Sequence, residues 1–302
     1  MNSVPSIKAR LTNYAKKTSR TVQEVFTTYI IERVLYRISI SKYADNFTLK
    51  GGVLLYGLYM EDFFRSTTDI DLLGIGISND KKDMKSVFED ILSLPADDPI
   101  RFDIDNLEVS DIAEFKQYHG VRISTMAYLD RTRVPVIIDV GFGDIVYPNR
   151  MRMDFPTLIN DIAPSLYVYS IYSMIAEKTE AIISLGITNS RYKDFYDLFT
   201  IPEREDLDGR TLKNALTETF NNRDTSLDTI SAFDDGFADN YYRQQRWKGF
   251  LKSKNVMLQI SFSEVVASVK AFLFPVIESI RDNKEFSSSW NHSLKNWECE
   301  GE

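Results

Sequence analysis

The chain has 302 residues, of which 43% are hydrophobic and 26% charged, a composition typical of a folded globular protein and too apolar for extensive disorder. Its single cysteine, Cys299, excludes an intrachain disulfide and a cysteine zinc cluster. No apolar run approaches the roughly 18 residues that span a bilayer, and the N-terminus lacks the apolar core of a signal peptide. We therefore expect a cytoplasmic protein without a membrane segment.

Charge is distributed unevenly along the chain, although the net charge is −8. Residues 1–40 carry seven basic and two acidic side chains, whereas residues 61–117 carry fifteen acidic and six basic ones. Residues 240–263 carry five basic and no acidic side chains. Such charge runs are most often solvated faces, but an acidic middle between basic ends also fits a metal-binding centre flanked by phosphate-binding surfaces. The net negative charge therefore does not exclude a nucleic-acid partner.

The first half of the chain reads as mixed helix and strand. Apolar residues at helical spacing predict two helices over residues 6–40, and a third is expected over 51–60, opened by two glycines. A short strand is expected over 70–77, followed by a helix to about residue 92. Strand-like runs then occupy residues 100–109, 121–129 and 134–142. The last run is mostly apolar and β-branched, which predicts a central strand buried on both faces.

The second half is predicted to be nearly all helical. Helices are expected over residues 168–185, 190–199, 209–222, 236–254 and 262–281. The tail, residues 282–302, is polar and is expected to be loosely held. The fold class is therefore α/β, with N-terminal helices and a small mixed sheet in a domain over residues 1–150 and a mostly helical lobe over residues 151–302.

Two carboxylates at the start of the predicted strand 70–77 are the sharpest indication of a chemical site in the sequence. Residues i and i+2 of a strand point to the same face, so Asp69 and Asp71 would aim at one spot. Like charges this close repel unless a cation lies between them, and Mg²⁺ is the natural partner of hard oxygen ligands. Asp139 interrupts the apolar strand 134–142, where an unpaired carboxylate is costly. If the two strands are neighbours, Asp139 completes a three-carboxylate site for one or two Mg²⁺ ions.

The surroundings of this pair suit a phosphate. Gly51 and Gly52 permit close backbone approach at the start of a helix. The side chains that we expect to contribute phosphate or hydroxyl contacts are Lys50, Arg65, Ser66 and Thr67. A glycine pair at a helix start, a spacer and then D-x-D on a strand is the arrangement of polymerase-β-like nucleotidyltransferases. In that arrangement, metal ions bridge an NTP and activate an attacking hydroxyl.

At this point the sequence resembles a known family. Successive motifs of the AbiEii/AbiGii toxin nucleotidyltransferases look like residues 47–52 (FTLKGG), 54–56 (LLY), 65–74 (RSTTDIDLLG), 138–144 (IDVGFGD), 175–178 (IAEK) and 189–198 (NSRYKDFYDL), with Val53 departing from the family pattern. The resemblance implies a nucleotidyltransferase core, an NTP substrate, Mg²⁺ and a cognate antitoxin. It also implies a toxin active in phage defence or growth arrest, with the 3′ end of tRNA as the preferred acceptor.

The later motifs predict further site residues in the helical lobe. Lys178 lies inside an apolar helix, where its side chain would either extend to solvent or place its ammonium on a triphosphate, and the resemblance favours the triphosphate. Asp194 would orient Lys178 or the nucleotide sugar. Arg191 and Lys193 are expected to touch phosphates, with solvated charges as the equal alternative. Asp197 is expected to make a cap or an ion pair. We expect Lys178 and Asp194 to join the carboxylates in one active site, where Asp139 would bind the catalytic metal and assist deprotonation of the hydroxyl.

The segment 241–250 interleaves basic and aromatic residues, which suits RNA through phosphate contacts and stacking. Its basic members are Arg243, Arg246 and Lys248. An amphipathic helix with inward aromatics is a somewhat stronger interpretation.

Two other functions stay open at this stage. One is a small-molecule nucleotidyltransferase of the aminoglycoside type, which would use the same carboxylates. The other is a non-catalytic binding module, against which the intact carboxylates argue.

Overall fold

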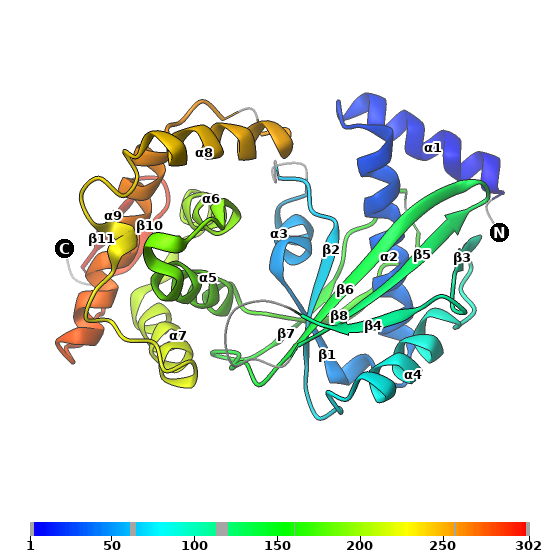
Figure 1. The fold of residues 1–302 in the computed structure, drawn as a ribbon, viewed down its shortest axis with the longest axis horizontal. Helices are drawn as coiled ribbons and strands as arrows, with labels where there is room; N and C mark the ends of the chain where they lie inside the picture. Colours follow the sequence, from blue (N-terminus) through cyan, green and yellow to red (C-terminus); the bar gives the residue numbers. More distant parts are fainter. Residues whose placement is uncertain (1–2, 61–64, 113–119, 160, 257, 300–302) are drawn as a thin grey trace. The chain divides into compact units, whose positions relative to one another are not determined.

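The computed structural model describes residues 3–60, 65–112, 120–159, 161–256 and 258–299 (Figure 1). The chain divides into two compact units, and each is described by itself. The first unit comprises Met1–Asp144 and Arg150–Tyr169, and the second comprises Ile145–Asn149 and Ser170–Glu302. The boundary expected near residue 150 differs from this division, because two strands after residue 150 pair with the sheet of the first unit.

The first unit is α/β. Its helices are α1 (Val4–Lys17), α2 (Val22–Ile40), the 3₁₀ turn η1 (Ala44–Asn46), α3 (Gly51–Tyr59) and α4 (Lys81–Leu92). Its strands are β1 (Phe47–Lys50), β2 (Asp69–Gly74), β3 (Ile100–Phe102), β4 (Glu108–Asp111), β5 (Val121–Leu129), β6 (Thr132–Phe142), β7 (Met151–Asp154) and β8 (Ser165–Val168). The expected helix over 51–60 and strand over 121–129 are thus confirmed almost to the residue.

These strands form one mixed sheet in the order β3-β5-β6-β2-β1-β8-β7, with β4 also paired to β5. β2 runs parallel to β6 and antiparallel to β1, and β6 runs antiparallel to β5. The four strands β1, β2, β6 and β5 are therefore neighbours across the middle of the sheet (Figure 1). This order makes the 69–74 and 134–142 segments adjacent, as the three-carboxylate hypothesis required.

The two faces of the central strands differ in burial. Along β6 the residues alternate between buried and partly exposed, with Ile138 and Val140 buried and Asp139 partly exposed. Ile70 and Leu72 of β2 share the buried face, which α2 and α4 help to cover. The prediction that the 134–142 strand is buried on both faces is wrong, because its neighbours place charged side chains on the second face.

The second unit is mostly helical. Its helices are α5 (Ile171–Leu185), η3 (Gly186–Thr188), α6 (Tyr192–Thr200), α7 (Gly209–Asn222), η4 (Ser231–Phe233), α8 (Tyr241–Ser253) and α9 (Phe262–Arg281). The expected helices over 209–222 and 262–281 are confirmed. α8 begins five residues later than the expected 236, because Asn240 caps its N-terminus by accepting hydrogen bonds from the backbone N–H groups of Tyr242 and Arg243.

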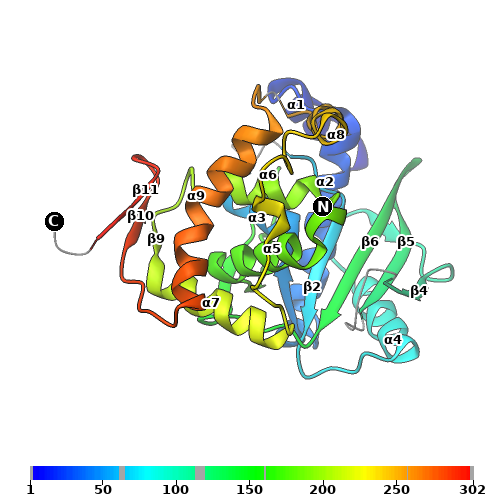
Figure 2. The same ribbon diagram turned by 60° about the vertical axis from the view of Figure 1, so that its left-hand side comes forward.

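The polar tail is ordered through most of its length, contrary to expectation. β9 (Leu207–Asp208), β10 (Ser289–Asn291) and β11 (Asn296–Glu298) form a small antiparallel sheet, seen beside α9 in Figure 2. Trp290 and Trp297 pack their rings against Phe272 of α9, with centroids 4.9 and 5.6 Å away. The two tryptophans hold the tail against α9 by burying aromatic surface, which the polar composition of the tail did not indicate.

No helix in the described part of the chain is long and apolar enough to span a bilayer.

Candidate active site

A row of four charged side chains crosses the middle of the first unit's sheet. In the register of the strands, Lys50 of β1 lies opposite Asp71 of β2, Asp71 beside Asp139 of β6, and Asp139 opposite Arg122 of β5. Residues paired in this way share one face of the sheet. Two carboxylates therefore lie side by side at the centre, with one cation on each side.

The outer cations each make a close ion pair. Arg122 Nε and Nη2 donate to the two carboxylate oxygens of Asp139, both at 2.7 Å. Lys50 Nζ lies 2.7 Å from Asp144 Oδ2 and 5.3 Å from the centre of the Tyr169 ring. The phosphate contact predicted for Lys50 would therefore compete with the ion pair to Asp144.

The start of α3 lies directly against this row. Gly51 has φ +70°, and a Cβ at this position would fall 1.9 Å from Asp71 Oδ2. Only glycine therefore lets the backbone approach the carboxylate this closely. The N-terminus of a helix such as α3 presents backbone N–H groups that suit a phosphate.

Two of the predicted phosphate-binding side chains lie at the same helix start. A Cβ on Gly52 would lie 2.8 Å from Arg65 Nη2 and 2.8 Å from Thr67 Oγ1. Arg65 is 6% exposed, so its guanidinium is held close to the backbone of α3. Ser66 is partly exposed in the same connection. The structure thus brings Gly51, Gly52, Arg65, Thr67 and Asp71 together, as the motif predicted.

The carboxylates fit a hard divalent cation in part. Asp69 and Asp71 share a face of β2, and Thr68 Oγ1 donates to Asp69 Oδ1 at 3.1 Å. Among the described residues, however, no three acidic, histidine or cysteine side chains gather closely enough to hold a metal. Arg122 instead pairs with Asp139. Mg²⁺ is commonly held by one or two carboxylates plus waters and substrate phosphates. The donor set therefore suits Mg²⁺, with Arg122 as the competitor for the third carboxylate.

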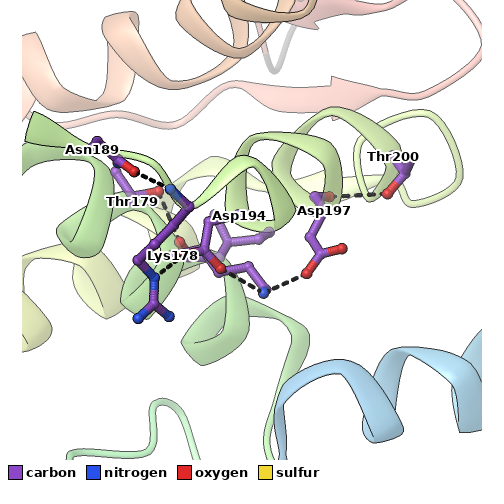
Figure 3. Close-up of polar contacts among 8 residues, drawn as sticks. Lys178, Thr179, Asn189, Asp194, Asp197 and Thr200 are labelled. Atoms are coloured by element: carbon purple, nitrogen blue, oxygen red, sulfur yellow. Dashed lines mark hydrogen bonds and ion pairs between the residues drawn. The ribbon is translucent and has the colours of Figure 1, made fainter. Parts of the chain in front are cut away.

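In the second unit, Lys178 of α5 is enclosed by two carboxylates of α6 (Figure 3). Its Nζ lies 2.6 Å from Asp197 Oδ2 and 3.2 Å from Asp194 Oδ1. Lys178, Asp194 and Asp197 are 8%, 2% and 0% exposed. Asp197 thus makes an ion pair, one of its two expected contacts, and Asp194 contacts Lys178, one of the two groups that it was expected to orient.

The electrostatics of this cluster keep Asp194 ionised. Burial alone raises the pKa of its carboxyl, but the charges of Lys178, Arg191 and Lys193 outweigh that effect and hold the pKa well below its usual value. Arg191 Nε donates to Asp194 Oδ2 at 2.6 Å, so this guanidinium supports the carboxylate. Lys193 is exposed, as expected for a solvated charge.

The basic and aromatic side chains of helix α8 divide between the interior and the surface. Trp247 is fully buried and stacks on Phe250 at 5.4 Å, whereas Tyr241 and Tyr242 are 69% and 75% exposed. Its aromatic residues therefore serve both packing and the surface. Of the predicted RNA-binding residues, Arg246 and Lys248 are exposed and Arg243 is partly exposed.

Two features of the site were missed by sequence reasoning. Arg122 has no local signal, since it is one polar position in an alternating strand, and only the register of β5 places it on Asp139. The pairing of Lys50 with Asp144 joins residues 94 positions apart. Both are consequences of strand order, which no short motif encodes.

A mixed sheet with paired carboxylates beside a glycine-led helix defines the class of protein, a nucleotidyltransferase. Solved structures share the fold. MenT4, a nucleotidyltransferase toxin from Mycobacterium tuberculosis, is 13% identical with a TM-score of 0.53, the match covering 92% of this chain and 99% of that one. A candidate nucleotidyltransferase from H. pylori is 10% identical with a TM-score of 0.52, over 88% of this chain and all of that one. At these identities the likeness concerns the fold alone.

The family is shown by a family model, "Nucleotidyl transferase AbiEii toxin, Type IV TA system", which matches residues 33–268. The chain therefore belongs to this family and is a nucleotidyltransferase toxin of a type IV toxin–antitoxin system. Membership implies an NTP substrate and an antitoxin partner, and nucleotidyltransferases generally use a divalent metal. No curated protein sequence matches the chain.

Proposed function

We propose that the chain transfers a nucleoside monophosphate from an NTP to a hydroxyl of RNA, preferably at the 3′ end of tRNA, with release of pyrophosphate. The observation that carries this proposal is the contact of Asp71 with the Gly51 backbone at the start of α3. It joins a carboxylate able to hold Mg²⁺ with backbone N–H groups able to hold phosphate oxygens. A nucleoside triphosphate bound to Mg²⁺ needs both the carboxylate and the backbone N–H groups.

Each residue has a distinct role in this proposal. Asp69, Asp71 and Asp139 would hold Mg²⁺, which when bound offsets phosphate charge and makes a hydroxyl more acidic. Asp139 would also accept the proton of the attacking hydroxyl, a task for which Arg122 must release it. Arg65 and Thr67 would hold phosphate oxygens beside Gly52. Lys178, oriented by Asp194 and Asp197, would neutralise triphosphate charge.

The test is to incubate the protein with each α-³²P-labelled NTP, Mg²⁺ and total RNA, and then to locate the label. We expect label in tRNA, removed by 3′-end trimming, and none with Asp71→Asn. Asp105→Asn is the matched control, because Asp105 belongs to a second D-x-D sequence and is exposed in the same unit. Label in a small molecule or in protein, or transfer by Asp71→Asn equal to that of the control, would contradict the proposal.

Arg122→Ala tests the competition at Asp139. Removing the guanidinium frees both carboxylate oxygens, so Mn²⁺ added in place of Mg²⁺ should bind several-fold more tightly, as measured by electron paramagnetic resonance without nucleotide. Arg133→Ala, on the neighbouring part of β6, is a charge-matched control. Unchanged Mn²⁺ affinity in Arg122→Ala would show that Asp139 is not a metal ligand.

A further inference from the structure

The second unit contains an open, polar pocket of about 360 Å³ between the η3 turn and the N-terminal end of α8. Its walls include Asn189, Tyr192, Tyr242, Arg243 and Arg246. These residues all belong to the second unit. No acidic side chain lines the pocket among the described residues, so its charge comes from two guanidinium groups.

The first arginine is fixed in place by the turn opposite α8. Arg243 Nη1 donates to the carbonyl oxygen of Asn189 at 2.8 Å, and its Nη2 donates to that of Ile187. Its guanidinium also lies 4.0 Å from the centre of the Phe237 ring. A guanidinium held on one side by carbonyls and an aromatic face keeps an orientation that suits a phosphate.

The second arginine lies on the same side of the helix. Arg246 is three residues after Arg243, a spacing that places two side chains on one helix face. It is exposed, so binding an anion would require little desolvation of the protein. Two arginines on one face can share a single phosphate or contact two successive ones.

Asn189, a residue of the pocket wall, carries a buried side-chain amide. Asn189 is 3% exposed, and its Oδ1 accepts a hydrogen bond from the backbone N–H of Arg191 at 2.7 Å (Figure 3). Its Nδ2 has no hydrogen-bond partner within the described ranges of the chain. Buried donors are rarely left unsatisfied, and this one belongs to a residue of the pocket wall.

Aromatic rings complete the pocket. Tyr242 is 75% exposed although it is a large side chain, and it lies at the pocket rim. Tyr192 forms part of the wall, with its ring 5.2 Å from that of Phe262. An exposed tyrosine beside arginines is the combination that binds single-stranded nucleic acid, since a base stacks on the ring while the phosphate meets the guanidinium.

We propose that this pocket binds one nucleotide of a single-stranded RNA segment, with the phosphate at Arg243 and Arg246 and the base on Tyr242. The proposal rests on the proposed function, in which RNA is the acceptor, and gives that RNA a binding site in the second unit. The basic stretch 240–263, which carries no acidic residue, would guide the strand along α8.

The chain offers two matched pairs of variants. Tyr242→Ala is compared with Tyr241→Ala, because Tyr241 is 69% exposed and adjacent but does not line the pocket. Arg246→Ala is compared with Arg210→Ala, which removes the same charged group from an exposed position of α7, in the same unit and outside the pocket. All four residues are exposed on helices of the second unit, so all four variants should fold, and circular dichroism verifies this.

Binding is measured without NTP, by fluorescence anisotropy of a labelled single-stranded RNA of twelve nucleotides. We expect Tyr242→Ala and Arg246→Ala to bind about tenfold more weakly than wild type, and the two controls to bind within about twofold. Arg246→Ala should also lower the slope of log affinity against log salt by about 0.7. A blunt RNA duplex should bind more weakly than the single strand and show no difference between pocket and control variants.

Several results would overturn the proposal. The first is that the wild-type protein does not bind the RNA, and the second is that pocket and control variants lose binding equally. The third is that the pocket variants bind RNA as the wild type does but no longer bind the antitoxin. Because the assay needs no catalysis, its outcome is separate from the label-transfer test. If no label is transferred but the pocket variants lose RNA binding, the proposed function fails and the pocket remains.

Discussion

Replacement of Lys178 by methionine tests whether the second unit depends on a buried ion cluster. The side chain of Lys178 is 10% exposed, and the two carboxylates that it bonds are 2% and 0% exposed. Methionine preserves most of the volume but removes the charge, which leaves two like charges buried 2.6 and 3.2 Å from the vacated Nζ position. Removing one partner of a buried pair costs about 3–5 kcal/mol. We expect the free energy of unfolding to fall by about this amount.

Tryptophan fluorescence during urea unfolding measures this change directly. The three tryptophans of the chain, Trp247, Trp290 and Trp297, all belong to the second unit, so the signal reports on that unit alone. With a slope of about 2 kcal/mol per molar urea, the midpoint should fall by roughly 2 M. The measurement is made at pH 7.

Two further variants decide the cause. Lys193→Met on α6 removes an exposed charge and should change stability by less than about 0.5 kcal/mol. Lys178→Met combined with Asp197→Asn should be more stable than Lys178→Met alone, because one buried charge is gone. A Lys178→Met protein as stable as Lys193→Met would refute the buried-cluster argument and leave Lys178 with a purely chemical role.

Three other predictions concern single residues. Gly51→Ala should cost more than about 2 kcal/mol and lower nucleotide transfer, since its Cβ would meet Asp71 Oδ2; Gly143→Ala, with φ +83° and open space for a Cβ, should cost only the strain of about 1 kcal/mol. Equal costs would show that the contact with Asp71 is unimportant. Burial raises the pKa of Glu32 to about 8. Stability contributed by this protonated carboxyl is therefore complete below pH 4.5 and lost as the pH rises toward 8. In Glu32→Gln the urea midpoint should depend less on pH over that range. A pH dependence equal to that of the wild type would contradict the raised pKa of Glu32. The pKa of Asp194 is shifted in the opposite direction, downwards. Its ionised carboxylate therefore stabilises the fold at every pH above the usual aspartate pKa, and this stabilisation is lost only as the pH falls into strong acid. Asp194→Asn should accordingly reduce the acid sensitivity of the tryptophan signal, and a profile identical to that of the wild type would exclude this role.

Local elements were largely predictable from the sequence, because helical periodicity and turn residues act over a few positions. The helix opened by Gly51 and the helices over 209–222 and 262–281 appear where the pattern placed them. The tail was misjudged, since Trp290 and Trp297 acquire their partner on α9 only after folding. Composition averages over such a segment and conceals two anchoring side chains.

The candidate site divides in the same way. The sequence by itself determined which chemistry is available: D-x-D on a strand, glycines at a helix start, and a lysine in an apolar helix with aspartates one motif later. Tertiary structure alone decided which groups meet, because strand order and register set the neighbours of every side chain on the sheet. It placed Asp139 beside Asp71, as expected, but also brought Arg122 onto Asp139 and Asp144 onto Lys50. The sequence determines where a carboxylate occurs, whereas the tertiary structure determines which cation pairs with it.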